Sequence, residues 1–270
     1  MSGTGEQVQI ALVQQGSALD PELNRVAVAE LAGHRPVAEA DLVVLPEAFA
    51  RDFGSPRDDL ARYAEPVGGP FTEAVSGLAG EQRTVVAGMF ERSEDPARPF
   101  NTLLVRGAAK AEYRKIHLYD SFGYRESDRL TAGPLEPVTF ALGGFTVGLL
   151  TCYDLRFPEL ARALVERGAD LLVIPAAWVA GRDEAEHKLK IHHWETLVRA
   201  RAIENVCYVA AVGQPGPRYT GHSMVVDPRG EVMVRAGAGE QVISALLDPD
   251  AVATARAANP SLANRRAFPG

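Results

Sequence analysis

Residues 145–174 read FTVGLLTCYDLRFPELARALVERGADLLVI, and this stretch decides the fold class. Its first part, as far as Cys152, has the apolar character of a buried strand. A helical pattern follows over 158–167, with Pro158 at a permissible first turn and Gly168 as its stop. The apolar run 170–174 is a second strand. This strand–helix–strand order predicts an α/β fold.

The same alternation continues on both sides of this stretch. Towards the N-terminus we expect strands at 8–13, 41–46 and 84–90 and helices at 21–31 and 70–82. From residue 101 to 142 strands follow one another without helices, at 102–106, 111–116 and on both sides of a Gly143-Gly144 hairpin turn. Beyond 174 we expect helices at 183–204 and 251–257 and strands at 206–212, 223–226, 231–235 and 242–247. Strands flanked by helices in both halves indicate two packed sheets with helices outside.

Composition narrows the class of partner. The 270 residues carry 28 Lys and Arg against 35 Asp and Glu, a net charge of −7, and no basic block suited to nucleic acid or an anionic membrane. We therefore expect a small solute as partner. No linker divides the chain, so we expect one domain over 1–270. Residues 1–9 lack the features of a secretory signal, and no apolar run approaches the roughly 18 residues of a membrane span, which predicts a soluble, cytoplasmic protein.

Three residues stand where an apolar run ends, which is where functional groups collect in α/β folds. Taken singly, Glu47 is best explained as a solvated loop residue and Lys115 as a surface lysine, while Cys152 is equally well a core residue or a functional thiol. Taken together they can do chemistry. A thiol is only a few per cent ionised at neutral pH, so a base such as Glu47 and a cation such as Lys115 would make Cys152 a competent nucleophile. Lys115 would also stabilise an oxyanion.

The segments around these residues resemble conserved blocks of the nitrilase (carbon–nitrogen hydrolase) superfamily, with its Glu-Lys-Cys triad. The matching blocks are LVVLPE (42–47), YRKIHLYD (113–120), GLLTCYDLRFPEL (148–160), HHWETLVRARAIEN (192–205) and GHSMVVDPRGEV (221–232). The resemblance implies a four-layer αββα sandwich with two mixed sheets packed face to face. It also implies a homodimer, or a higher homo-oligomer, in which helices near the cysteine and the C-terminal tail, about 258–270, meet the partner chain. Neither a metal nor an organic cofactor is expected.

The resemblance also implies a role for each residue. Glu47 accepts the thiol proton, Cys152 attacks an amide carbonyl to form a thioester with release of ammonia, and water then hydrolyses the thioester. Lys115 and the backbone N–H of Tyr153 stabilise the oxyanion. Glu126, the second glutamate of the family, holds Lys115 and helps to position the substrate.

Resemblance to particular branches suggests the substrate. True nitrilases carry Trp-Glu-Asn after the nucleophile, whereas Tyr153 and the residues after it look like the amidase branches. The chain looks most like deaminated-glutathione amidases, with ω-amidases acting on α-keto acid amides as the alternative. Both substrates carry carboxylates, so Arg156 is a candidate to bind one, although it could equally brace its loop. Trp178 either lines the pocket or packs in the core. The charged stretch 179–191 departs from these branches and leaves the substrate open.

Other signals are weaker. His187, His192 and His193 lack the spacing of a zinc site, and Ser223 lacks the glycine that would complete a nucleophile elbow. Cys207 lies inside an apolar run and is expected in the core. A non-catalytic binding protein on the same fold, and acyl transfer to an amine in place of water, remain as alternatives to hydrolysis.

Overall fold

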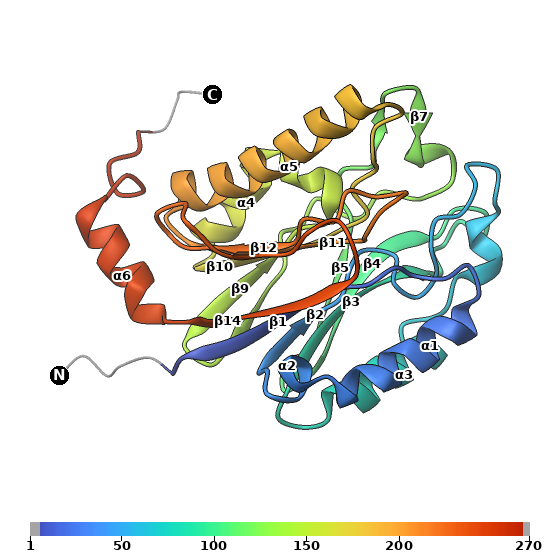
Figure 1. The fold of residues 1–270 in the computed structure, drawn as a ribbon, viewed down its shortest axis with the longest axis horizontal. Helices are drawn as coiled ribbons and strands as arrows, with labels where there is room; N and C mark the ends of the chain where they lie inside the picture. Colours follow the sequence, from blue (N-terminus) through green and yellow to red (C-terminus); the bar gives the residue numbers. More distant parts are fainter. Residues whose placement is uncertain (1–5, 267–270) are drawn as a thin grey trace.

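Two six-stranded sheets form the centre of the computed structural model, which describes residues 6–266 (Figure 1). The first has the order β14-β1-β2-β3-β4-β5 and consists of β1 (Val8–Gln14), β2 (Leu42–Val44), β3 (Thr84–Glu91), β4 (Phe100–Gly107), β5 (Ala111–Arg114) and β14 (Gln241–Leu247). The second has the order β13-β12-β11-β10-β9-β8 and consists of β8 (Thr139–Leu142), β9 (Phe145–Leu149), β10 (Leu171–Ala176), β11 (Tyr208–Gly213), β12 (Met224–Val226) and β13 (Val232–Arg235). In each sheet three adjacent strands, β1-β2-β3 and β11-β10-β9, pair in parallel and the remaining pairings are antiparallel, so both sheets are mixed.

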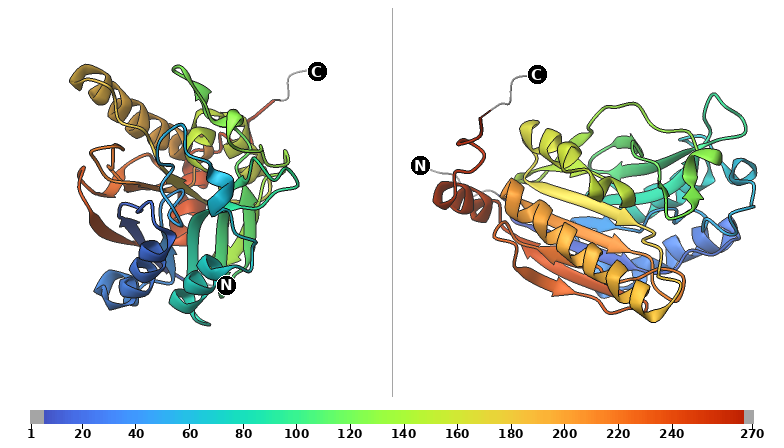
Figure 2. Two further views of the ribbon diagram at one scale, coloured as in Figure 1. Left: turned by 90° about the vertical axis from the view of Figure 1, so that its right-hand side faces the viewer. Right: turned by 90° about the horizontal axis from the view of Figure 1, so that it is seen from above.

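Helices cover the outer faces of both sheets (Figures 1 and 2). The first sheet is covered by α1 (Pro21–Glu30), α2 (Arg35–Ala38) and α3 (Pro70–Ala79), and the second by α4 (Pro158–Glu166) and α5 (Glu184–Asn205). The last helix, α6 (Pro249–Ala258), follows β14. Short 3₁₀ turns lie at Leu31–Gly33, Leu60–Tyr63, Glu126–Asp128 and Cys152–Arg156. The expected αββα sandwich is therefore confirmed.

The central strands are buried on both faces, which explains why they are continuous apolar runs. In β1, Ile10 and Leu12 belong to the core between the two sheets. Ala11 and Val13 point the other way and pack in the same cluster as Val28 of α1. Side chains alternate between the two faces because successive Cβ atoms in a strand point in opposite directions.

Several element ends differ from the prediction. The strand expected over 111–116 ends at Arg114, because the Lys115 carbonyl accepts a hydrogen bond from Gly133 N at 2.8 Å and the chain leaves the sheet there. The helix expected over 70–82 ends at Ala79, since Gly80 is left-handed with φ 62°. The strand expected from 206 begins at Tyr208, because Val206 is the left-handed cap of α5 with φ 47°. The helix expected over 251–257 spans Pro249–Ala258, with Asp248 as its N-cap.

Between β5 and β8 the structure adds a feature that the prediction lacked. A two-stranded ribbon of β6 (Asp120–Ser121) and β7 (Tyr124–Arg125) projects beside the N-terminal half of α5. The Gly143-Gly144 hairpin is confirmed, with Leu142 paired to Phe145. Within 6–266 no helix combines the length and the apolar character that a membrane span requires. The expected partner contact of residues 258–270 stays a prediction, and 267–270, like 1–5 of the N-terminal segment, lie outside the described residues.

Candidate active site

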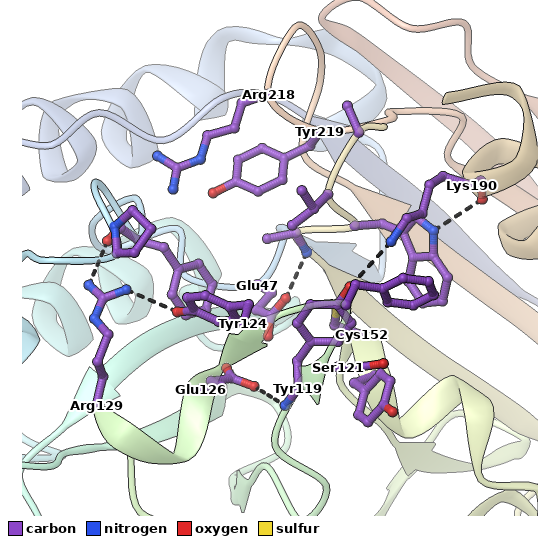
Figure 3. A pocket seen from close by; sticks show the side chains of 18 of the residues that line it. Glu47, Tyr119, Ser121, Tyr124, Glu126, Arg129, Cys152, Lys190, Arg218 and Tyr219 are labelled. Atoms are coloured by element: carbon purple, nitrogen blue, oxygen red, sulfur yellow. Dashed lines mark hydrogen bonds between the residues drawn. The ribbon is translucent and has the colours of Figure 1, made fainter. Parts of the chain in front are cut away.

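The ends of strands from both sheets meet around one cavity of about 250 Å³ (Figure 3). Glu47 follows β2, Lys115 follows β5 and Cys152 follows β9, and all three line this cavity together with Glu126. β5 runs in the same direction as β2 and β3, because two antiparallel pairings separate it from β3. The four residues predicted to act together are therefore brought together.

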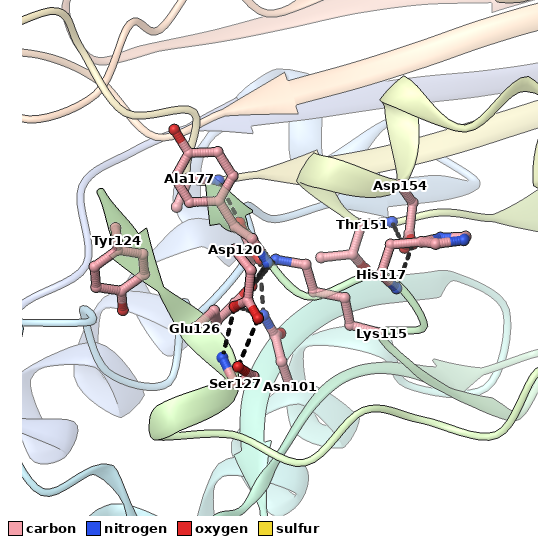
Figure 4. Close-up of polar contacts among 12 residues, drawn as sticks. Asn101, Lys115, His117, Asp120, Tyr124, Glu126, Ser127, Thr151, Asp154 and Ala177 are labelled. Carbon is pink, nitrogen blue, oxygen red and sulfur yellow. Dashed lines mark hydrogen bonds and ion pairs between the residues drawn. The ribbon is translucent and has the colours of Figure 1, made fainter. Parts of the chain in front are cut away.

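Lys115 is the centre of the polar cluster (Figure 4). Its Nζ donates to Glu47 Oε1 at 2.9 Å and to both oxygens of Glu126, at 3.0 Å and 2.9 Å. Lys115, Glu47 and Glu126 are each at most 2% exposed. Two buried carboxylates thus share one buried ammonium, which leaves the cluster with one net negative charge while the Cys152 thiol is neutral. Such a cluster titrates as a unit.

The charges of this cluster shift one another's pKa. Burial lowers the pKa of Lys115, but the carboxylates of Glu126 and Glu47 outweigh burial and hold that pKa well above its ordinary value. Burial raises the pKa of Glu126; the charge of Lys115 opposes this and the charge of Glu47 adds to it. Lys115 is therefore a permanent cation at any ordinary working pH.

Cys152 occupies a constrained position at the start of the turn after β9. Its backbone is left-handed, with φ 47°, and its side chain is buried among core residues at the cavity wall. Burial raises the pKa of its thiol well above the ordinary value, and the negative charge of Glu47 raises it further, while Lys115 lowers it. The resting sulfur is thus a neutral thiol that needs a base. Left-handed non-glycine residues carry backbone strain and are concentrated at functional sites.

Glu47 is fixed by groups that the sequence analysis did not identify. Its Oε1 also accepts from Asn101 Nδ2 at 2.7 Å, and its Oε2 accepts from the backbone N–H of Ala177 at 2.7 Å. Gly88 of β3 lies so close that a Cβ there would stand 2.8 Å from Glu47 Cα. A polar Asn101 and a glycine inside buried strands were the available signals.

Asp154 ties the Lys115 segment to the Cys152 segment and was also missed (Figure 4). Its Oδ2 accepts from the Tyr113 hydroxyl at 2.6 Å and from Thr151 N at 2.9 Å. Its Oδ1 accepts from His117 N at 3.0 Å and lies 2.7 Å from His117 Nδ1. One fully buried carboxylate therefore sets the position of Lys115 relative to Cys152.

The other predicted site residues line the same cavity. Tyr153 packs edge-to-face on Tyr119, with ring centroids 5.0 Å apart. The Arg156 guanidinium lies 5.0 Å from the centre of the Trp178 ring. Trp178 is only 5% exposed, so it lines the cavity and also packs in the core. The residues of the charged stretch that border the cavity are Val179, Ala180, Arg182, Glu186 and Lys190.

The weaker sequence signals have structural explanations. Ser223 is buried, and its hydroxyl contacts Gln14 and the backbone of Gly213. Cys207 is fully buried in the core, as expected, and burial raises its pKa to about 12. Between residues 6 and 266 no three His, Cys, Asp or Glu side chains gather in a group that could hold a metal ion.

Comparison with known proteins agrees with this architecture. The Carbon-nitrogen hydrolase family pattern matches residues 9–257. The chain is 42% identical over 269 residues to Hydrolase MT0498 of Mycobacterium tuberculosis (strain CDC 1551 / Oshkosh), covering 92% of each chain. It is 37% identical over 250 residues to deaminated glutathione amidase of Escherichia coli O157:H7, covering 92% of this chain and 93% of that one.

A solved structure shows the same fold. XC1258 of Xanthomonas campestris, described as a CN-hydrolase superfamily protein with an arsenic adduct in the active site, superposes with a TM-score of 0.85 at 32% identity. The match covers 98% of this chain and 99% of that one. On the family match and these identities, the chain belongs to the carbon–nitrogen hydrolase (nitrilase) superfamily.

Proposed function

We propose that this protein is an amidase that cleaves the C–N bond of a small carboxylate-bearing amide through a thioester on Cys152. The observation that carries the proposal is the buried Lys115 ammonium, shared by Glu47 and Glu126 beside the Cys152 thiol in a single cavity. Acyl transfer to sulfur uses a thiol, a group that can act as base and then as acid, and a cation that stabilises the oxyanion. Cys152, Glu47 and Lys115 would supply these three groups.

In the first half of the reaction Glu47 accepts the Cys152 proton as the sulfur attacks the amide carbonyl carbon. This transfer leaves the net charge of the buried cluster unchanged, because one carboxylate is neutralised as one thiolate forms. Lys115 and the backbone N–H of Tyr153 stabilise the oxyanion; one such donor is typically worth about 10²–10³ in rate. The protonated Glu47 then donates to the leaving nitrogen, which departs as ammonia from a primary amide or as an amine from a substituted one.

In the second half Glu47 removes a proton from water as the water oxygen attacks the thioester carbon. The carbon–sulfur bond then breaks, the acid leaves, and Glu47 returns the proton to the Cys152 sulfur. Glu126 holds Lys115 in place through both of its oxygens. An acceptor amine in place of water would give acyl transfer by the same steps.

The cavity supports a carboxylate-bearing substrate. Arg156 lines the cavity. Its guanidinium lies 3.4 Å from His193 Nδ1, and among the described residues it forms no hydrogen bond to a carboxylate. A relative 37% identical bears the name deaminated glutathione amidase. Deaminated glutathione and the ω-amide of α-ketoglutarate share one acyl group and differ in the amine, so the size of the leaving group separates the two candidates.

The test is a panel of amides: deaminated glutathione, α-ketoglutaramate, glutaramate and neutral amides of equal length. Release of cysteinylglycine or ammonia is measured for the parent and for Cys152→Ala. We expect turnover of at least one carboxylate-bearing amide by the parent, none by Cys152→Ala, and an acyl adduct on Cys152 in quenched reactions analysed by mass spectrometry.

Three outcomes would count against the proposal. A Cys152→Ala variant as active as the parent would show that Cys152 is not the nucleophile. An acyl adduct on Cys207 would show that Cys207 is the nucleophile instead. If no amide is cleaved but carboxylate ligands still bind, the protein is a binding protein on a hydrolase fold.

A further inference from the structure

Lys190 of α5 is a buried cation with no carboxylate partner. The residue is 6% exposed and lines the cavity that holds Cys152. Its Nζ donates one hydrogen bond, to the Tyr119 hydroxyl at 3.2 Å (Figure 3). No acidic side chain among residues 6–266 lies within salt-bridge distance of it. An ammonium has three donors, so two remain unused.

The surroundings of Lys190 offer it aromatic rings but no anion. The Phe122 ring centre lies 3.9 Å from Nζ and the Tyr119 ring centre 5.7 Å, so two aromatic faces shield one side of the ammonium. Glu186, one turn earlier in α5, is engaged by Arg182 through both its backbone N–H and its Nε. The carboxylate whose charge acts on Lys190 is thus already paired with Arg182.

Burying a charge without a partner is expensive, and an anionic ligand in the cavity would supply the partner that Lys190 lacks. We propose that Lys190 is the receptor for the distal carboxylate of the substrate, so that the site selects monoamides of dicarboxylic acids over neutral amides. This inference rests on the proposed function for its substrate and names the residue that sets its specificity. Arg156, whose charge acts on Lys190, supplies a second cation to the same cavity.

The stretch that carries Lys190 strengthens the assignment. Five residues of the charged stretch 179–191 border the cavity. The Trp178 indole N–H donates to the Lys190 carbonyl at 3.1 Å, which fixes this turn of α5 against the cavity wall. Lys190 is therefore held in position before a ligand arrives, and preorganised charges lose little entropy on binding.

The receptor should depend on pH. Burial lowers the pKa of Lys190, and the charge of Arg156 lowers it as well, while that of Glu186 raises it. The charged and titratable groups around Lys190 are Glu186 and His193 on its own helix, Arg182 just before that helix, Cys152 and Arg156 in the segment after β9, and Tyr119 before β6. Rising pH removes the ammonium charge earlier than in an exposed lysine, so preference for an anionic substrate falls as pH rises.

The test compares glutaramate with valeramide, which replaces the carboxylate by a methyl group. We expect Lys190→Met to lower kcat/KM for glutaramate by about 30-fold or more, as for loss of one partner of a buried charge pair, and to leave valeramide within about twofold. Lys190→Arg should keep the preference and, because arginine does not titrate, should remove its decline at high pH. Taking the ratio of kcat/KM for glutaramate to kcat/KM for valeramide at each pH removes the effect of any group whose titration changes both values equally.

The matched control is Lys188→Met on the same helix. Lys188 is exposed, pairs with Glu184 and does not line the cavity, so both substrates should react as with the parent. Equal losses for both substrates in Lys190→Met, or no loss for either, would overturn the assignment.

A binding measurement separates this inference from the proposed function. Calorimetric titration of the Cys152→Ala variant with glutarate measures binding without turnover. We expect glutarate to bind this variant, and we expect the added Lys190→Met substitution to raise the Kd at least about tenfold. If the parent cleaves no amide while this difference is observed, the proposed function fails and the receptor stands. Glutarate binding that is unchanged by Lys190→Met contradicts the receptor even if amides are cleaved.

Discussion

Glu47 has two opposing effects on Cys152 at the scale of single residues. In the proposed mechanism it removes the thiol proton as a base, but as a negative charge it raises the pKa of that thiol. The two effects are compatible because proton transfer from sulfur to Glu47 removes the charge that makes the thiolate unfavourable. On this proposal the nucleophile is generated during attack and does not accumulate as a free thiolate.

Replacing Glu47 by glutamine should separate these two effects. Turnover should fall by about 10²–10⁴-fold with loss of the acid–base group. The pKa of Cys152 should fall at the same time, because the neighbouring negative charge is gone and Lys115 remains. Iodoacetamide alkylation followed against pH, with the adduct located by mass spectrometry, measures this pKa.

Cys207 serves as the internal control in that experiment, since its pKa of about 12 and full burial should leave it unmodified below pH 9 in parent and variant alike. A Cys152 pKa in Glu47→Gln equal to or above that of the parent would contradict the electrostatic account.

At the scale of elements, the site depends on how closely strands approach one another. Glu47 lies in the turn that follows β2, and the next residue, Ala48, has a left-handed backbone with φ 54°. This turn passes directly over Gly88 of β3. A Cβ at Gly88 would stand 2.5 Å from Ala48 N, closer than real Cβ contacts. The absence of a side chain at one buried strand position therefore sets where the base lies.

Gly88→Ala should push the Glu47 turn away from β3. We expect a loss of about 1–3 kcal/mol in the free energy of unfolding, as for other overpacked cores, and a fall in kcat that exceeds any change in KM. Urea denaturation and steady-state kinetics measure the two.

Gly77→Ala is the matched control for Gly88→Ala. Gly77 lies in α3 with nothing within 4 Å of its would-be Cβ, so alanine there should stabilise the protein by about 0.5–1 kcal/mol through helix propensity and leave kcat unchanged. A Gly88→Ala variant that behaves like Gly77→Ala would refute the close-approach argument.

At the scale of the whole molecule, two buried glutamines connect the two halves of the sandwich. Gln14 of β1 accepts from the backbone N–H of Ser223 at 2.8 Å and from its hydroxyl at 2.7 Å, and its amide donates to the Gly237 carbonyl. Gln214, after β11, donates to the Glu47 carbonyl at 2.9 Å. The first sheet and its active-site turn are thus bonded to the segments around β11 and β12.

Gln14→Leu keeps the volume and removes these bonds. Because buried polar groups left without partners cost about 1–3 kcal/mol each, we expect the free energy of unfolding to fall by about 3 kcal/mol. Gln9→Leu in the same strand is the control, since the Gln9 side chain is partly exposed and should change stability by less than about 0.5 kcal/mol. Urea denaturation decides, and equal stability of the two variants would show that Gln14 does not connect the sheets.

Much of this molecule follows from local sequence patterns. The central strands are recognisable because burial on both faces demands continuous apolar runs, and their helices because caps and glycine stops are local signals. Glu47, Lys115 and Cys152 could be named because each directly follows such a run. The ends of the elements are predicted less accurately. The strand before Lys115 stops at Arg114 because the Lys115 carbonyl accepts a hydrogen bond from the backbone N–H of Gly133, a distant contact that no local pattern reveals.

The sequence by itself therefore determined the layers of the fold and the residues at its strand ends. Only the tertiary structure decided which groups hold them and which side chains line the cavity. Asn101 reaches Glu47 across 54 residues, Asp154 reaches Tyr113 across 41, and Lys190 reaches Tyr119 across 71. The physical reason is that strand and helix formation depend on neighbours in the chain, whereas the pairing of a buried charge depends on which distant segments pack around it.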